Sequence, residues 1–593
     1  MTVLIKRLAF ITALSLLLLL FSGCETSGDG IASLPWEEYD TLISNARAEA
    51  DTTVREAYLH EAEDMLMDTG CISPLYYQSD IYLMSEGVTG VYSSSIGSKY
   101  FMYANVSGED TLNTAFCGSV SSIDPAFATT VAEMSLVVNL FAGLYTYDSD
   151  GNLTTQLAQF TDVSDDGLVY TFTIKEGLLW SDGTSLGASD IAYSWRRLAD
   201  SSTGSEYAYL LDVIALDEDD SLMIESDETD LILTVTLSAP CSYFLELCAF
   251  PALYAVKQSE IEYADGYTDY YGNVIDIDAW TIGTGFAVSG AYSVSSNADG
   301  TYALSKNENF IDAENVTLSS LSITVSSDSE SLYSLYQTGE IAFLGSVSSE
   351  LLEEDDSSEN NADENKSISQ TGVAEGEIYR DELQSVYFLA LNFNSDIYNG
   401  MTAEDAKLLR QAILLYIDRE LIVDELTGED EEIATSLIPS MTSDGSEGIY
   451  KKNDSRYTYS DTTSRGYYST STEENRERAR EIIASLGLDE DGDGVLDSSI
   501  TLTYLTLKTS LNIEIAQSIQ QDLSMLGIIV QVSAVDKTVY DFEQSIFNYD
   551  IIAAEAFACY DDALTFLERW ITDAPLNYTG LGSEIVEENE NAY

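Results

Sequence analysis

Apolar residues take alternate positions from Leu168 to Ile174, with threonines between the last three of them. This alternation predicts a strand with one apolar and one polar face. Two turns follow, the second at Ser181-Asp182-Gly183, where Asp and Gly are typical turn residues. From Ala188 the apolar residues are spaced as on one face of a helix. The stretch 165–197 is therefore predicted to run strand, turn, turn, helix.

Two other regions have clear periodicity. Apolar residues between Tyr39 and Leu66 fall into two helical runs, and the following residues 72–84 favour a strand. In the second half, the pattern strand, helix, strand at 500–507, 512–526 and 528–533 predicts a βαβ unit with parallel strands. A buried strand at 387–394 and a helix at 408–421 are predicted before it.

The composition indicates a folded protein with more than one lobe. The 593 residues are 45% hydrophobic and 11% aromatic, which excludes wholesale disorder. The chain has 25 Lys+Arg against 102 Asp+Glu, a formal net charge of -77. Such a field repels nucleic acid and anionic lipid, so neither is a predicted partner. A solvated acidic surface explains the charge more simply than a surface that attracts cations for a function.

The first residues resemble an export signal. Lys6 and Arg7 precede an apolar run from Leu14 to Phe21, which is too short to span a membrane. Ser22-Gly23-Cys24 at its end looks like a lipobox, which implies cleavage before Cys24 and a diacylglycerol anchor on its sulfur. The prediction is a protein anchored by lipid to the extracytoplasmic face of the cell membrane. An ordinary signal peptide with an accidental cysteine is the alternative.

The residues offer little support for catalysis, and no catalytic residue and no cofactor is predicted. His60 is the single histidine, so no multi-histidine metal site can form, and a Ser-His-Asp triad or a Cys-His pair would have to use this one residue, which lies in a polar run. A reaction that uses carboxylates alone stays possible, although no spacing singles out a pair.

One acidic loop has some features of a calcium site. Asp489, Asp491 and Asp493 alternate with Gly492 nearby, as in an EF-hand loop, but position twelve is Ile500 instead of the bidentate Glu. An acidic turn is therefore favoured over a weak calcium site, and no metal is predicted. The cysteines after Cys24 contain no C-x-x-C pair, which argues against a zinc site or a disulfide scaffold.

The stretch 165–197 also resembles a family signature. It is similar to the segment D-G-x-x-Y-T-F-x-L-R-x-x-x-x-W-S-D-G-x-x-x-T-A-x-D-x-x-Y-S-W of the peptide-binding proteins of ABC importers, bacterial solute-binding family 5. Gly187 stands where the family usually has a helix-capping Thr. The resemblance implies a two-lobed α/β fold of the periplasmic-binding-protein type with an extra subdomain.

The same resemblance implies a function. A monomer would capture a peptide and deliver it to the permease and ATPase subunits of an ABC importer. Two alternatives remain: a signalling or adhesive lipoprotein with the same fold, and a binder of a nickel chelate or a sugar.

The family motifs occur here in a different order. Residues 36–106 resemble the family's C-terminal end, yet the motifs of its beginning, at 122–125 and 139–144, come only afterwards. The match ends at 577–580, where a relative would continue with the segment that stands first here. This order indicates a circular permutation, which is physically cheap because the termini of compact domains often lie close together. A gene-assembly accident is the rival explanation.

The predicted division of the chain follows from these motifs. It consists of a signal peptide at 1–23, a lipidated tether at 24–35, the permuted segment at 36–106, a first lobe with the extra subdomain at 107–375, and a second lobe at 376–593.

The resemblance also implies which residues contact the ligand. In the family an extended peptide adds as a strand between the lobes. The register places one ligand-pairing strand at Thr129, Thr130 and Val131, and its partner at Glu555, Ala556 and Phe557. Tyr207 stands where a family tyrosine lines the end of the cleft.

At position 559 this chain has a neutral residue where the family has a charged one. Cys559 stands where oligopeptide-binding relatives have an Asp that receives the peptide ammonium, and a neutral thiol cannot balance that charge. Either Asp561 or Glu555 takes this role, or the natural ligand lacks a free amino end. The second hypothesis is favoured.

Overall fold

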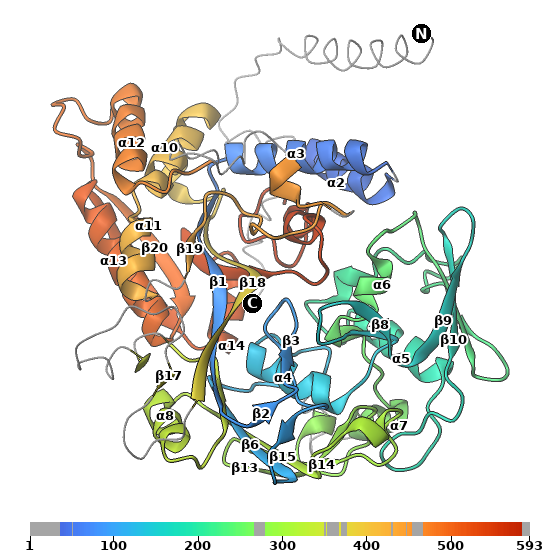
Figure 1. The fold of residues 1–593 in the computed structure, drawn as a ribbon. Coiled ribbons are helices and arrows are strands. Elements are labelled where there is room, and N and C mark those ends of the chain that lie inside the picture. The colour runs from blue at the N-terminus through green and yellow to red at the C-terminus, as the bar shows by residue number, and fades with distance from the viewer. Residues whose placement is uncertain are drawn as a thin grey trace, which may run out of the picture.

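The computed structural model describes residues 36–583, except for 50, 266–278, 349–350, 353–366, 369–375, 428–430, 446–447 and 454–466. The predicted signal peptide and tether lie outside the described residues. One twelve-stranded sheet runs through the molecule, and a separate four-stranded sheet lies to one side of it (Figure 1). Across the described part of the chain, every helix falls short of the length and hydrophobicity that a membrane span requires.

Two long antiparallel strands form the middle of the large sheet. These are β1 (Ile72–Ser85) and β18 (Gly376–Leu391), in which Ile72 pairs with Ala390 and Met84 with Glu377. Near its end β1 also pairs with β16 (Phe343–Gly345), and the end of β18 pairs with β22 (Ile551–Phe557). The two strands therefore connect the halves of the sheet. We call the half on the β16 side the first lobe and the half on the β22 side the second lobe.

The second lobe contains the predicted βαβ unit. Strands β20 (Ile500–Leu507) and β21 (Ile528–Val535) are parallel, and α13 (Ser510–Met525) connects them. This confirms the prediction from periodicity. The helix predicted at 408–421 is interrupted instead, because α10 (Ala403–Leu415) ends before Asp418 caps a new turn at Arg419–Leu421. Helix α12 (Thr472–Leu486) packs against α10.

The first lobe carries the smaller sheet, in the order β11-β12-β10-β9. The strand β10 (Val169–Ile174) buries Tyr170, Phe172 and Ile174 and leaves the residues between them partly exposed, as predicted. Helix α5 (Ala188–Ala199) follows, also as predicted, and Ile191, Trp195 and Leu198 are buried. The other strands of this sheet are β9 (Ala158–Val163), β11 (Ile224–Ser226) and β12 (Ile232–Thr236).

The segment before β1 packs on the second lobe. The indole of Trp36 donates to the carbonyl of Trp570 at 2.7 Å, and the hydroxyl of Tyr39 donates to that of Leu567 at 2.7 Å. The helices α2 (Glu37–Ala48) and α3 (Thr52–Asp68) both pack against α15, which confirms that they pack on this lobe. A circular permutation requires this packing, and the permutation itself stays a hypothesis.

The remaining described helices and strands complete the sheets and the helices around them. They are β2 (Val88–Thr89), β3 (Tyr92–Ser93), β4 (Lys99–Tyr100), β5 (Asn105–Val106), β6 (Thr111–Cys117), α4 (Val131–Leu140), β7 (Tyr145–Tyr147), β8 (Leu153–Thr155), α6 (Phe244–Leu247), α7 (Gln258–Asp265), β13 (Tyr292–Ala298), β14 (Thr301–Lys306), β15 (Ser320–Ser326), α8 (Ser329–Gln337), β17 (Ser367–Ile368), β19 (Glu432–Ile433), α14 (Lys537–Ser545) and α15 (Leu564–Leu567).

Candidate ligand-binding site

The strand β22 has one edge that its neighbours leave partly open. On the β18 side, the amide of Ala558 donates to Gln384 and that of Asn392 donates to Asp550, so even-numbered residues of β22 bond to β18. The main-chain groups of Glu555 and Phe557 therefore point to the opposite edge. There β20 pairs only with residues 551 and 552, and no other described strand continues the pairing. The open edge includes the predicted residues Glu555 and Phe557, whereas Ala556 bonds towards β18.

The predicted strand at Thr129–Val131 is wrong. Thr130 is the N-cap of α4, and its side chain accepts the amide of Glu133 at 3.2 Å. The Glu133 carboxylate in turn accepts the amides of Thr129 at 2.9 Å and Thr130 at 3.0 Å. This capping box makes Val131 the first helical residue and engages the amides of Thr129 and Thr130 within the chain. The predicted ligand contact of these three residues stays a prediction.

Aromatic residues of the first lobe meet β22 beside its open edge. Tyr207 is buried, and its ring centroid lies 5.2 Å from that of Phe250 and 6.4 Å from that of Phe557. Its hydroxyl donates to the carbonyl of Ala128 at 2.8 Å. The structure thus brings Tyr207 and Phe557 together, although the hydroxyl of Tyr207 is already used within its own lobe.

Cys559 and Asp561 lie just beyond β22 at the junction of the lobes. Cys559 is buried, its Sγ lies 3.7 Å from the hydroxyl of Tyr209, and burial raises the pKa of its thiol to about 12. The Asp561 carboxylate accepts from Gln384 at 2.7 Å and from the amide of Ser443 at 2.9 Å. Asp561 is therefore engaged within the second lobe, and Cys559 is a neutral thiol at neutral pH.

Glu555 is the other acid that could receive a ligand ammonium. Its side chain is exposed to solvent, yet the surrounding protein atoms raise its pKa by desolvation, and a hydrogen bond with Gln78 lowers it again in part. Glu555 is thus exposed to solvent and also closely surrounded by protein atoms. Its role in binding a ligand ammonium stays a prediction.

The two lobes touch directly beside this site. The rings of Tyr243 and Tyr560 stack with centroids 4.0 Å apart, and Glu246 accepts the amide of Asp561 at 2.8 Å. Burial raises the pKa of Glu246 to about 7, and the charges of Asp561 and Asp562 add to this rise against the amide hydrogen bond. The junction therefore holds an acid that is far easier to protonate than an exposed one.

We expect this acid to make stability depend on pH. The folded pKa of about 7 lies above the ordinary 4.5, so the folded form holds an extra proton between these values. The contribution of Glu246 is full below about pH 4.5 and is lost as the pH rises through 7. Denaturant unfolding of wild type and Glu246→Gln at several pH values measures it. The wild type should lose more stability than the variant from about pH 5 to 7.5, and parallel curves would contradict the expectation.

Several residues at the junction were not predicted. They include Glu206 and Tyr209, which flank the predicted Tyr207, and Arg569, three residues beyond the family-like Phe566. The clustering of charged and phenolic residues around Tyr207 was visible in the sequence. The signal for Arg569 was weaker, namely a basic residue within an apolar run of a very acidic chain.

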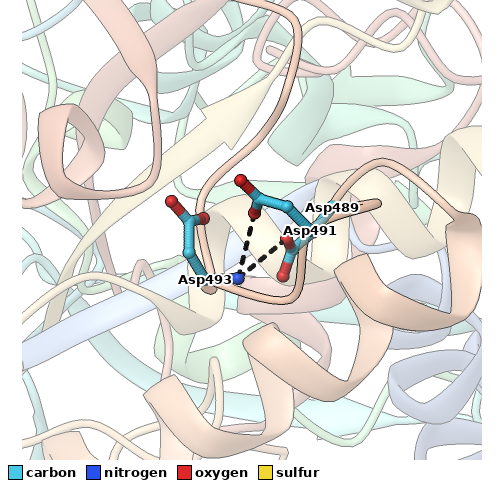
Figure 2. Close-up of side chains that lie close together, drawn as sticks. All are labelled: Asp489, Asp491 and Asp493. Atoms are coloured by element: carbon cyan, nitrogen blue, oxygen red, sulfur yellow. Dashed lines mark hydrogen bonds between the residues drawn. The ribbon is translucent and has the colours of Figure 1, made fainter.

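The acidic loop at 489–493 connects α12 to β20. Figure 2 shows the three carboxylates around the turn, where their oxygens lie within 4.8 Å of one another. The carboxylate of Asp489 accepts the amides of Gly492 at 2.8 Å and Gly494 at 2.9 Å, and Ile500 begins β20. These hydrogen bonds explain the loop as an acidic turn that its own backbone stabilises.

The fold and this junction define a class of protein: two lobes that share one sheet and meet beside an open strand edge, as in proteins that enclose a ligand. The family model described as "Bacterial extracellular solute-binding proteins, family 5 Middle" matches residues 152–578, which is more than half of the chain. The chain belongs to this family. The predictions of the family, of a binding protein instead of an enzyme, and of a place outside the cytoplasm are confirmed at this level.

Curated relatives and solved structures agree with the family. The chain is 27% identical to the dipeptide-binding protein of Lactococcus lactis subsp. cremoris, with 83% of each chain covered. It is 24% identical to the oligopeptide-binding protein OppA of Bacillus subtilis, with 82% of this chain and 81% of the relative covered. Listeria monocytogenes OppA bound to peptide superimposes with a TM-score of 0.61 and 23% identity, over 80% of this chain and 86% of that one. The predicted fold class is confirmed.

Proposed function

We propose that this protein captures peptides outside the cytoplasm and delivers them to the permease and ATPase subunits of an ABC importer. The observation that carries the proposal is the open edge of β22 beside the lobe junction, where no described strand pairs with the main-chain groups of Glu555 and Phe557. An extended peptide can add to such an edge as a further strand. The names of the relatives, dipeptide-binding and oligopeptide-binding proteins, support a peptide as the ligand.

The contacts predict broad specificity in the central part of the ligand. Main-chain hydrogen bonds from Glu555 and Phe557 do not depend on the side chains of the peptide. The flanking aromatic rings of Tyr207 and Phe250 offer apolar contact without polar discrimination. We therefore expect the protein to discriminate between peptides mainly by the charged or polar groups at the two ends of the peptide.

A mass-spectrometric inventory of the bound ligand tests the proposal. The protein is purified without denaturation from a host that exports it, and the small molecules released by acid are identified. We expect short peptides in near-stoichiometric amount. A nickel chelate, a sugar or a bile acid as the released ligand would refute the peptide proposal and leave the solute-binding family intact.

We further propose that the protein is held on the membrane by a lipid on Cys24. The lipobox-like sequence before Cys24 supports this anchor. We expect Cys24→Ser to move the protein from the membrane fraction to the soluble fraction of an exporting host. Cys117→Ser, which changes a cysteine inside the fold, serves as the control and should stay with the membrane. Equal membrane retention of Cys24→Ser and wild type would refute the anchor.

A further inference from the structure

Arg569 is a buried cation that has no counter-ion among the described residues. It is only 5% exposed, its Nε is buried without a hydrogen-bond partner, and it forms no hydrogen bond or ion pair with the described residues. Burying an unpaired guanidinium costs several kcal/mol, so a fold rarely keeps one without a use. In a chain with 102 Asp+Glu against 25 Lys+Arg, an arginine that lacks an acidic partner is especially unexpected.

The positive charge of Arg569 affects the pKa values of residues at the lobe junction. It lowers the pKa of Cys559 and of Tyr209, both of which burial raises, and it acts in the same direction on Glu206 of the first lobe. The geometry of the segment agrees with this, because the hydroxyl of Thr565, four residues before Arg569, accepts the amide of Cys559 at 3.1 Å. The neighbouring Glu568 accepts the hydroxyl of Tyr560 at 2.7 Å, so the segment that carries Arg569 packs against the residues just beyond β22. Cys559 and Tyr209 are neutral at neutral pH, so neither balances the guanidinium.

The acids of the neighbourhood are engaged elsewhere. Glu568 pairs with Arg47 at 2.7 Å and accepts the hydroxyl of Tyr560 at 2.7 Å. Asp541 pairs with Lys537 at 2.6 Å, and Glu133 accepts the amides that precede α4. Glu206 forms no ion pair with Arg569, and burial raises its pKa, which weakens it as a counter-ion.

We propose that Arg569 binds a carboxylate at the end of the ligand, in a site completed by the hydroxyl of Tyr209 and the neutral thiol of Cys559. This inference rests on the proposed peptide-binding function and names the chemistry of the ligand's end. A guanidinium binds a carboxylate with two parallel hydrogen bonds, and Tyr209 offers a further donor. The carboxylate has two possible sources, the C-terminus of the peptide or an acidic group on a blocked amino end.

Calorimetric titration with four probes distinguishes these sources. The probes are acetyl-tetra-alanine amide without charge, acetyl-tetra-alanine with a free C-terminal carboxylate, succinyl-tetra-alanine amide with a carboxylate at the amino end, and tetra-alanine amide with a free ammonium. We expect one carboxylate probe to bind wild type at least about tenfold more tightly than the uncharged probe, the gain of a charge-assisted hydrogen bond. Arg569→Gln should lose this gain, and the control Arg480→Gln, at an exposed ion pair, should keep it.

Three results would overturn the inference: no gain from either carboxylate, a gain that persists in Arg569→Gln, or tightest binding of the ammonium probe. The last two leave the peptide proposal intact. If none of the four probes binds, the result counts against the peptide proposal. The role of Arg569 is then tested by a measurement that needs no ligand. We expect Arg569→Met to raise the melting temperature, because it removes a buried unpaired charge. A lower melting temperature would show a structural role and overturn the inference.

Discussion

Replacing Arg55 by alanine is expected to lower the free energy of unfolding by about 3–5 kcal/mol, the cost of leaving a buried charge without its partner. Arg55 of α3 donates to both carboxylate oxygens of Asp562, at 2.7 Å and 2.9 Å, and both residues are buried. The pair joins the segment before β1 to the end of the second lobe, 507 residues later in sequence. Chemical denaturation of wild type and Arg55→Ala measures the difference.

Two further variants test whether the loss of stability in Arg55→Ala comes from the unpaired buried charge of Asp562. Arg55→Ala with Asp562→Asn should be more stable than Arg55→Ala alone, because the amide removes the stranded charge and keeps an oxygen for the amide of Leu564. Arg480→Ala breaks an exposed ion pair with Glu473 and should cost less than about 1 kcal/mol. A loss of similar size in Arg55→Ala and Arg480→Ala would contradict a structural role of the Arg55 pair.

Local patterns predicted the elements better than their arrangement. The alternation in β10 and the spacing in α5 follow from neighbouring residues, so the sequence predicted both. The pairing of β1 with β18 joins Ile72 to Ala390, and no local period carries information about such a distant partner. The continuous sheet through both lobes was therefore not predictable from periodicity, although the strands themselves were.

The candidate ligand-binding site was also predicted only in part. Glu555, Ala556 and Phe557 lie on a strand as predicted, because an apolar run precedes them. At Thr129–Val131 the register of the family predicts a strand, whereas the local pattern Thr130-x-x-Glu133 is typical of a helix start, and α4 begins there. The importance of Arg569 depends on its burial and on the engagement of its acidic neighbours, and both are properties of the folded chain.

Replacing Phe557 by proline is expected to weaken peptide binding by about 10- to 100-fold, as estimated from a lost hydrogen bond and an unpaired carbonyl on the ligand. The amide of Phe557 points to the open edge of β22, and the even-numbered residues carry the bonds to β18. Proline removes that amide without removing a bond of the ladder with β18. The dissociation constants of wild type and variant for the peptide found in the inventory measure the effect.

Two controls isolate the missing amide. Phe557→Ala removes the ring that packs near Tyr207 and Phe250 but keeps the amide, so it should bind more tightly than Phe557→Pro. Ala556→Pro removes an amide on the β18 side and should instead destabilise the fold, by about 3 kcal/mol or more. If Phe557→Pro binds as tightly as Phe557→Ala, the ligand does not pair with this edge, and the open strand edge is not the feature that holds the peptide.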